Sequence, residues 1–246
     1  MEWIYGRNVV QLALAAGARR QAHRLAATPP ALKALRESLP PGLPVDTAAG
    51  HELDDLTGSR DHQGAALQVD SFRYAPPESV LQADVVVVLD EVSDPRNLGA
   101  VARSALAAGA GGLVVPKHRS ASVTPAAVKA SAGTIEHLPV AQVTNTVGFL
   151  KEAKDAGFWV YGAAGGVAAS YLQLDLTGRV VLVFGAEGRG LRPLVAKTCD
   201  ALASIPMEAA VESLNVSVAA ALFLFEARRQ RAAADGASAS RPGAGR

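Results

Sequence analysis

The sequence has a single cysteine, Cys199, only 5% aromatic residues, no excess of charge of either sign and no long apolar run. One cysteine excludes both an intramolecular disulfide and a zinc site built from several cysteines. The most apolar segment, residues 216–225, falls far short of the roughly twenty residues that span a bilayer. The first residues, MEWIYGRN, do not resemble a signal peptide. We therefore expect a cytoplasmic protein with no membrane association and no metal site.

The charge is balanced overall but unevenly distributed. Lys and Arg number 24 against 23 Asp and Glu, yet residues 1–37 hold six basic and two acidic side chains. Residues 95–135 hold five basic side chains and no acid, while residues 45–91 hold ten acids and two bases. The two basic segments favour phosphate binding, although basic side chains on a solvated face are the commoner explanation.

The hydrophobic pattern predicts two domains of different character. With 246 residues, 49% of them hydrophobic, the chain can bury one large core or two small ones. The proline pair at 76 and 77 predicts a linker, preceded by short helices and strands at residues 8–16, 30–39, 43–46 and 65–69. After it, apolar strands alternate with helical segments up to a long helix at 213–231, which predicts a parallel sheet covered by helices on both faces.

This pattern gives an α/β protein with a first domain at residues 1–70, a linker at 71–82 and a second domain at 83–231. Residues 232–246 contain only small residues, arginines, one aspartate and one proline, and we expect a disordered tail.

Neither of the common nucleotide-binding fingerprints is present. The first turn of the second domain, residues 94–99, reads DPRNLG rather than G-x-G-x-x-G, and no G-x-x-x-x-G-K-[ST] occurs. This argues against an ordinary nicotinamide enzyme, which has only the α/β pattern in its favour, and against an ATPase. A second glycine-rich turn, residues 185–190, follows an apolar strand and lets backbone N–H groups approach a ligand. A tight turn alone would also require its glycines.

Several polar residues near these turns are candidates for chemistry, and each has a structural alternative. Asn97 stands where a helix N-cap would be, and Arg103 on the same helix could form a surface ion pair. Glu187 could cap the next helix or pair with a base, and Ser213 is a plausible N-cap of the last helix. His62 is more typical of a hydrogen-bonded structural residue than of a ligand.

Taken together, three ordered segments resemble the motifs of the SpoU-type (TrmH-like) branch of the SPOUT RNA methyltransferases. They are Asn97-Leu98-Gly99-Ala100 with Arg103, then Phe184-Gly185-Ala186-Glu187-Gly188, and then Ile205-Pro206-Met207 with Ser213-Leu214-Asn215-Val216-Ser217. Residues 5–10, 62–64 and 115–120 are similar to the subgroup that methylates a guanosine ribose in 23S ribosomal RNA. Ala209 and Thr134 depart from the family pattern, in which glycine and alanine are expected.

The resemblance implies a fold and a cofactor. The second domain would be an α/β methyltransferase domain with a C-terminal trefoil knot, preceded by a small α/β substrate-binding domain that resembles a ribosomal-protein fold. S-adenosylmethionine would bind at the knot, with Gly185, Ile205 and Leu214 as contacts. Topology rules alone would never predict such a knot.

The resemblance also implies the reaction and its residues. Asn97, Arg103, Glu187, Ser213 and Asn215 match the family's active site for S-adenosylmethionine-dependent 2′-O-methylation during ribosomal RNA processing. Arg103 matches the family's base, but an arginine guanidinium stays protonated in proteins, so binding of a substrate phosphate is the simpler role. The family acts as a homodimer in which one protomer completes the RNA site of the other, and the apolar run at 222–225 is consistent with this arrangement.

The basic segments then become candidates for contact with RNA. The candidate residues are Arg7, Arg19 and Arg20 in the first domain and Lys117 and Arg119 in the second. Two alternatives remain open. A transfer RNA substrate is disfavoured because the transfer RNA enzymes of this group typically lack such a first domain. A non-catalytic RNA-binding dimer in ribosome assembly would not need Asn97 and Glu187.

Overall fold

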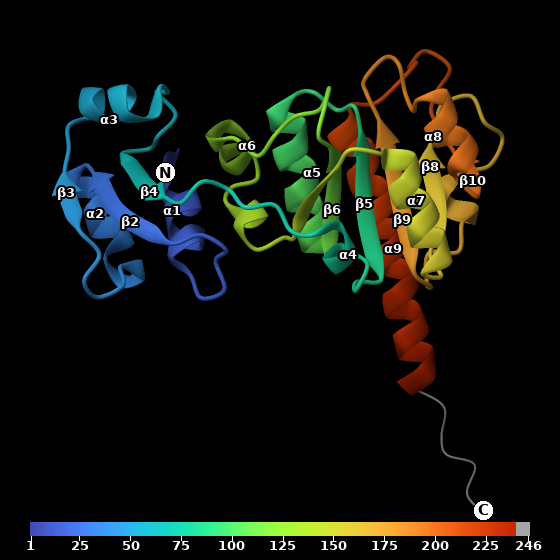
Figure 1. Ribbon diagram of the computed structural model, residues 1–246, viewed down its shortest axis with the longest axis horizontal. Coiled ribbons are helices and arrows are strands. Elements are labelled where there is room, and N and C mark those ends of the chain that lie inside the picture. Colours follow the sequence, from blue (N-terminus) through green and yellow to red (C-terminus); the bar gives the residue numbers. More distant parts are fainter. Residues whose placement is uncertain (240–246) are drawn as a thin grey trace, which may run out of the picture.

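The computed structural model describes residues 1–239, which form two lobes (Figure 1). The first lobe is built on a small four-stranded sheet. The strands run in the order β1-β4-β2-β3, with β1 and β2 antiparallel to β4 and β3 parallel to β2. They are β1 (Glu2–Tyr5), β2 (Ala22–Ala27), β3 (Val45–Thr47) and β4 (Ala65–Val69). The helices of this lobe are α1 (Arg7–Leu14), α2 (Pro29–Leu35), the 3₁₀ turn η1 (Arg36–Ser38) and α3 (Gly50–Thr57).

The second lobe is built on a six-stranded parallel sheet in the order β10-β8-β9-β5-β6-β7. Its strands are β5 (Val85–Asp90), β6 (Gly112–Pro116), β7 (Val140–Val143), β8 (Trp159–Ala163), β9 (Val180–Gly185) and β10 (Ala201–Ala203). Its helices are α4 (Pro77–Val80), α5 (Pro95–Ala108), α6 (Pro125–Ala130), α7 (Thr146–Asp155), α8 (Pro193–Thr198) and α9 (Val216–Ala239). Two 3₁₀ turns, η2 (Thr134–Glu136) and η3 (Tyr171–Gln173), complete it.

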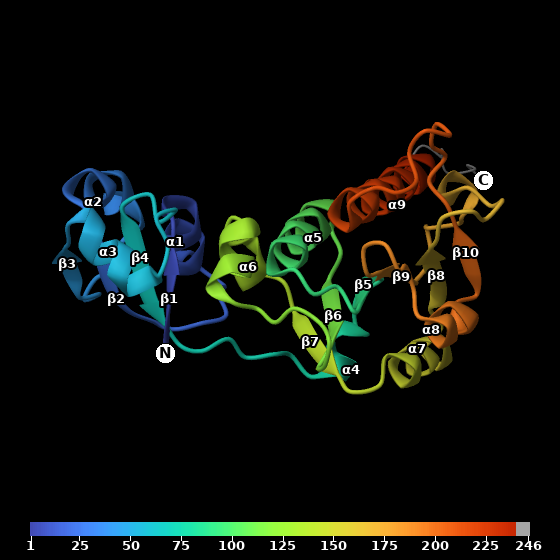
Figure 2. The same ribbon diagram turned by 90° about the horizontal axis from the view of Figure 1, so that it is seen from above.

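Helices cover both faces of this sheet, as the apolar strands predicted. Figure 2 shows α5, α6 and α9 on one face and α4, α7 and α8 on the other. All six residues of β5 are buried, because a central strand between two helical layers has no solvated face. The α/β architecture is therefore confirmed, whereas the trefoil knot stays a prediction. Among residues 1–239, no helix is both long and apolar enough to cross a membrane.

The segment expected to be a linker is attached to the second lobe. Ala75 N donates a hydrogen bond to Val140 O at 2.7 Å, and Ala75 pairs in parallel with Ala141 at the edge of the sheet. The short helix α4 follows, with Val80 fully buried. The proline pair thus interrupts the helices and strands, but the segment around it stays attached to the second lobe.

The last helix is longer than expected. Helix α9 continues to Ala239, so the prediction of disorder was wrong for residues 232–239. Alanine has the highest helix propensity, and three consecutive alanines follow Arg231. Residues 240–246 lie outside the part of the chain that the structure describes.

Candidate active site

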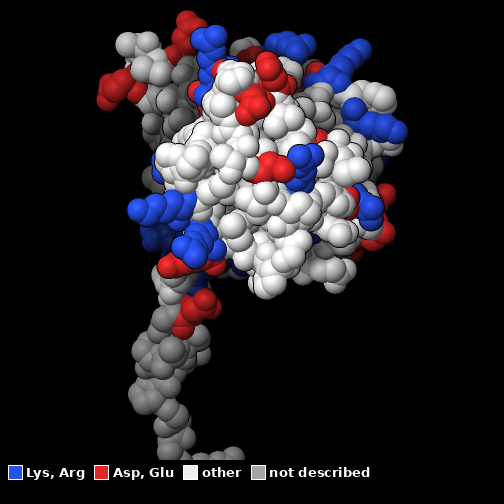
Figure 3. All heavy atoms as spheres, turned by 90° about the vertical axis from the view of Figure 1, so that its left-hand side faces the viewer, with Lys and Arg blue, Asp and Glu red and all other residues white. Residues whose placement is uncertain are grey.

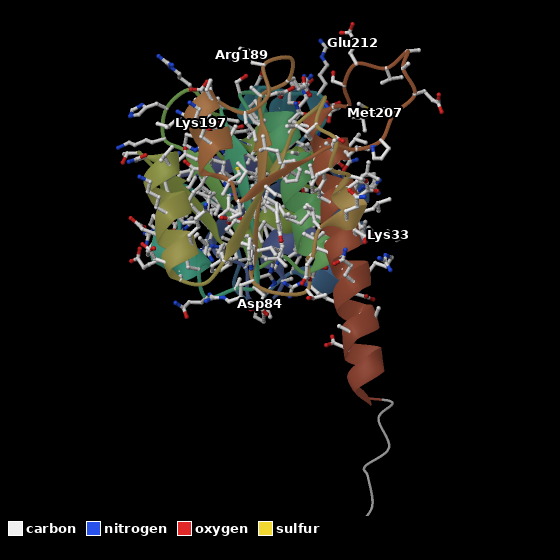
Figure 4. The ribbon with its side chains drawn as sticks, turned by 90° about the vertical axis from the view of Figure 1, so that its right-hand side faces the viewer. Lys33, Asp84, Arg189, Lys197, Met207 and Glu212 are labelled. Carbon is white, nitrogen blue, oxygen red and sulfur yellow. The ribbon has the colours of Figure 1, made fainter. Side chains whose placement is uncertain are left out.

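A cavity of about 780 Å³ opens where strands β9 and β10 end. All three predicted cofactor contacts, Gly185, Ile205 and Leu214, line it, together with Glu187 and Ser213. Figure 4 shows Arg189, Met207 and Glu212 at this end of the lobe and Asp84 at the opposite end. Ligands of parallel α/β sheets bind at the carboxyl ends of the strands, and pockets for small molecules measure roughly 300–1,000 Å³. Position and size both suit a cofactor.

The wall of the cavity includes a close approach of two backbone segments. A Cβ atom on Gly185 would lie 2.1 Å from the carbonyl carbon of Gly190 and 2.3 Å from the nitrogen of Leu191. Gly190 N donates to Ala186 O at 2.8 Å, which closes the turn, and Gly190 has a φ of +66°. Only glycine fits at position 185, because the obstructing atoms are backbone and no rotamer change can move them.

Three polar side chains from distant segments meet beside this wall. Asn97 Nδ2 donates to Glu187 Oε1 at 3.0 Å. Asn215 Nδ2 donates to Glu187 Oε1 at 2.6 Å and to Asn97 Oδ1 at 3.0 Å. We call these three residues the polar triangle. Within residues 1–239, Glu187 Oε2 has no hydrogen-bond partner, so the carboxylate keeps one oxygen free for a ligand.

The geometry overturns two capping interpretations. Asn97 is not the N-cap of α5; Asp94 is, and its carboxylate accepts from Arg96 N at 2.8 Å, so the Asn97 side chain is free for the polar triangle. Ser213 does not cap α9 either, because the helix begins at Val216. Asn215 precedes it, and its Oδ1 accepts from the backbone N of residue 217 at 2.9 Å. Asn215 therefore has two roles, as a cap and as a member of the triangle.

Arg103 stands apart from the other candidates. It is exposed on α5, lies outside the cavity lining and has no hydrogen-bond or ion-pair partner among residues 1–239. Six residues after Asn97, it points about 120° away from it around the helix. The structure thus brings Asn97, Glu187, Asn215 and Ser213 to the cavity region but leaves Arg103 unpaired on the surface.

An ion pair that the sequence pattern did not predict supports the cavity wall. Asp90, which is fully buried at the end of β5, accepts from Arg192 Nε at 2.9 Å and from Arg192 N at 3.1 Å. Arg192 also donates to Thr146 Oγ1 at 3.0 Å, and its hydrogen bond to Asp90 raises the pKa of its guanidinium. The pair ties the loop that carries Glu187 to the central strand. In the sequence, this pair is indicated by Asp90, an acidic residue at the end of an otherwise wholly apolar strand.

Of the five predicted RNA contacts, four are exposed. Arg7 lies at the start of α1, Arg19 in the loop before β2, and Lys117 and Arg119 in the loop after β6. Arg20 was predicted wrongly: its side chain is 2% exposed and paired with carboxylates, so it is unavailable to RNA. Figure 3 shows that Lys and Arg side chains lie mainly around the margin of the first lobe's outer face, whose centre is largely uncharged.

His62 is structural, as the commoner interpretation held. Its Nδ1 accepts from Gly64 N at 2.9 Å, which places the ring proton on Nε2, and Nε2 donates to Asp54 Oδ1 at 3.0 Å. Within the described residues, no group of three His, Cys, Asp or Glu side chains could hold a metal ion.

Comparisons with known proteins match both lobes. The model of the SpoU rRNA Methylase family matches residues 84–225, and that of RNA 2′-O ribose methyltransferase substrate binding matches residues 3–75. A protein of Mycobacterium ulcerans (strain Agy99), named an uncharacterized tRNA/rRNA methyltransferase, is 42% identical over 240 residues, which cover 94% of this chain and 77% of that protein.

Two solved structures differ in how much of the chain they match. The AdoMet-bound rRNA methyltransferase from Sinorhizobium meliloti has a TM-score of 0.75 and 27% identity, covering 93% of this chain and 87% of that one. The TrmH/SpoU tRNA modifying enzyme of A. aeolicus has a TM-score of 0.57 and 30% identity, covering 68% of this chain and 85% of that one.

Proposed function

Because the chain belongs to the SpoU rRNA methylase family, we propose that it methylates the ribose 2′-hydroxyl of a guanosine in 23S ribosomal RNA. It is an RNA 2′-O-ribose methyltransferase of that family, whose members use S-adenosylmethionine. The ribosomal RNA, the guanosine and the roles of individual residues are our proposal. The observation that carries it is the polar triangle beside the cofactor-sized cavity, in a chain whose first lobe matches an RNA substrate-binding domain.

The cavity fits the cofactor. Its walls combine exposed backbone at Gly185 with the apolar side chains of Ile205, Leu214 and Phe223, which suit a flat aromatic base and a polar tail. We assign cofactor binding to Gly185, Ile205 and Leu214. When bound there, S-adenosylmethionine supplies an electrophilic methyl group.

The protein must align the ribose and receive its proton. The free oxygen of Glu187 is a proton acceptor, and hydrogen bonds from Asn97 and Asn215 hold this carboxylate in place. Ser213, at the cavity, supplies a hydroxyl that can hydrogen-bond the ribose. Arg103 carries a permanent positive charge, so we assign it to the phosphate beside the target ribose.

The first lobe favours ribosomal over transfer RNA as the substrate. The tRNA modifying enzyme covers only 68% of this chain, whereas the rRNA methyltransferase covers 93%. The larger match includes a counterpart of the first lobe. In our proposal this lobe binds RNA through Arg7 and Arg19, and the second lobe binds it through Lys117 and Arg119. All four side chains are exposed.

We further propose that the protein acts as a homodimer. Val218, Leu222 and Phe225 are 48%, 37% and 48% exposed, and their i, i+4, i+7 spacing forms one apolar stripe on α9. The same helix packs its other face on α5, which carries Arg103. A second copy that covers the stripe would lie beside the helix that packs on α5, and we propose that Arg103 of one protomer serves the cavity of the other.

The substrate is tested by transfer of labelled methyl to unmodified 23S and transfer RNA transcripts, followed by alkaline hydrolysis. A 2′-O-methyl group blocks cleavage at the next phosphodiester, so we expect an alkali-resistant dinucleotide that begins with guanosine from 23S RNA alone. Label confined to transfer RNA would select the transfer RNA alternative. S-adenosylmethionine binding without label in either RNA would contradict methylation of free 23S RNA.

The cofactor assignment predicts a steric effect at Gly185. Gly185→Ala forces the backbone of Gly190 to move and is expected to raise the Kd for S-adenosylmethionine by at least about tenfold, or 1.4 kcal/mol. Isothermal titration calorimetry measures it. Gly165→Ala is the matched control, because Gly165 lines the same cavity but a Cβ there meets nothing within 4 Å. Equal affinities for the two variants would refute the assignment.

A further inference from the structure

A buried ion pair joins the two lobes. Arg20 lies in the first lobe, before β2, and Glu136 lies in η2 of the second, and their side chains are 2% and 1% exposed. Arg20 Nε donates to Glu136 Oε2 at 2.8 Å, and its Nη2 donates to the other carboxylate oxygen. Arg20 Nη1 donates to Glu2. One guanidinium therefore binds a carboxylate from each lobe.

Residues on either side of Glu136 also contact the first lobe. His137 Nε2 donates to the carbonyl oxygen of Leu12 at 2.9 Å. Gly133, with a φ of +89°, lies so close to α1 that a Cβ there would be 3.0 Å from Val9 Cα. Figures 1 and 2 both show α1 of the first lobe beside α6 of the second, and α6 also contacts β1. The lobes thus share a packed interface rather than a point contact.

The connecting segment is also held at this interface. Phe72 N donates to Glu2 Oε1 at 3.1 Å, and the Arg20 guanidinium lies 5.5 Å from the centre of the Phe72 ring. Two residues later, Tyr74 Oη accepts from Val123 N at 3.0 Å. The chain that leaves the first lobe is therefore fixed to both lobes and cannot act as a free tether.

A buried ion pair of this kind contributes more to orientation than to stability. The cost of removing both charges from water offsets much of their attraction, whereas a two-pronged arginine–carboxylate contact has a narrow range of geometry. Rotation of one lobe against the other would leave Arg20 and Glu136 buried without partners.

We propose that the Arg20–Glu136 pair fixes the angle between the lobes and so determines which ribose of the bound RNA reaches the active site. Both are positioning residues, and the proposal rests on the function proposed above. The exposed Arg7 lies on the fixed lobe, so a phosphate bound there has a set distance from the cavity. The enzyme would then choose its nucleotide by that distance as well as by local sequence.

The test replaces both charges and keeps the interface filled. Arg20→Met/Glu136→Leu removes the directional contact together with both of its buried charges. Glu2 loses its arginine but is 24% exposed and keeps the hydrogen bond from Phe72 N. We expect an unchanged Kd for S-adenosylmethionine and a larger radius of gyration in small-angle X-ray scattering. On 23S RNA we expect a KM raised by about tenfold or more, with methyl groups spread over neighbouring nucleotides. Arg60→Met, which removes an exposed charge from the same lobe at a residue with no assigned role, is the control and should keep the wild-type nucleotide and scattering curve.

A readout of nucleotide choice separates positioning from folding. Urea unfolding establishes that the double variant is folded. The charge-swapped variant Arg20→Glu/Glu136→Arg, made with Glu2→Gln so that residue 20 does not face a second carboxylate, should recover the wild-type nucleotide. The proposal would be overturned if the double variant had a larger radius of gyration but still methylated one nucleotide with the wild-type KM. Unchanged scattering would overturn it as well. If the wild-type protein methylates no RNA, the proposed function fails, and scattering alone then decides whether the pair fixes the lobes.

Discussion

Arg103→Ala is expected to lower methyl transfer to RNA by about 10²- to 10³-fold while leaving S-adenosylmethionine affinity unchanged. Arg103 lies outside the cavity lining, so its loss leaves the cofactor site intact. It has no partner in the described chain, so its charge is available to a substrate phosphate. Single-turnover transfer and calorimetry measure the two quantities. Arg96→Ala removes an exposed charge from the same helix and should chiefly weaken RNA binding in a salt-dependent way.

A mixing experiment then asks which protomer uses Arg103. In a mixture of Arg103→Ala with Gly185→Ala, a mixed dimer has one site with an intact cavity and the partner's intact Arg103. At an S-adenosylmethionine concentration well below the Kd of Gly185→Ala, both parent proteins have low activity, and subunit exchange is expected to restore about a quarter of wild-type activity. If Arg103 serves the cavity of its own chain, both sites of the mixed dimer lack one component and no activity returns.

Arg192→Met is expected to destabilise the protein by about 3–5 kcal/mol, because it leaves the buried Asp90 carboxylate without its charged partner. The loop that carries Glu187 loses its attachment to β5 at the same time, so S-adenosylmethionine affinity should also fall. Urea unfolding monitored by circular dichroism gives the first effect and calorimetry the second.

Two further variants isolate the cause. Arg189→Met removes an exposed charge from the same loop and should change stability by less than about 0.5 kcal/mol. Asp90→Leu/Arg192→Met removes both charges and should recover most of the stability, since a buried pair can often be replaced by apolar side chains. A single variant as stable as the wild type would show that the pair does not hold the loop.

The sequence was sufficient to predict those strands whose apolar pattern is set by burial. The continuous apolar strands of the second lobe could belong only to a sheet covered on both faces, and residues 65–69 form a strand with the predicted bounds. Strand β2 was missed because its residues, AHRLAA, neither alternate nor favour strands. Its pairing with β3 and β4 decides its conformation, and such long-range pairing leaves no local trace.

The motifs located the site, but side-chain partners could not be derived from them. Asn97 was an equally good helix cap by position, and only the fold reveals that Asp94 takes that role. Arg20 and Arg19 are indistinguishable as neighbouring arginines, yet one is buried against two carboxylates and the other is exposed. Spacing identifies residues of the right chemistry, whereas burial and partners depend on contacts between segments far apart in the sequence.

The polar triangle also has a consequence for how the enzyme is made. Its members are separated by 90 and 28 residues, and Asn215 immediately precedes the last helix. A chain growing on the ribosome therefore exposes its first lobe and its basic loops well before Asn215 has been synthesised. Activity requires that Asn215 has been synthesised, so a product terminated before α9 would keep its RNA-facing arginines but lack one member of the polar triangle.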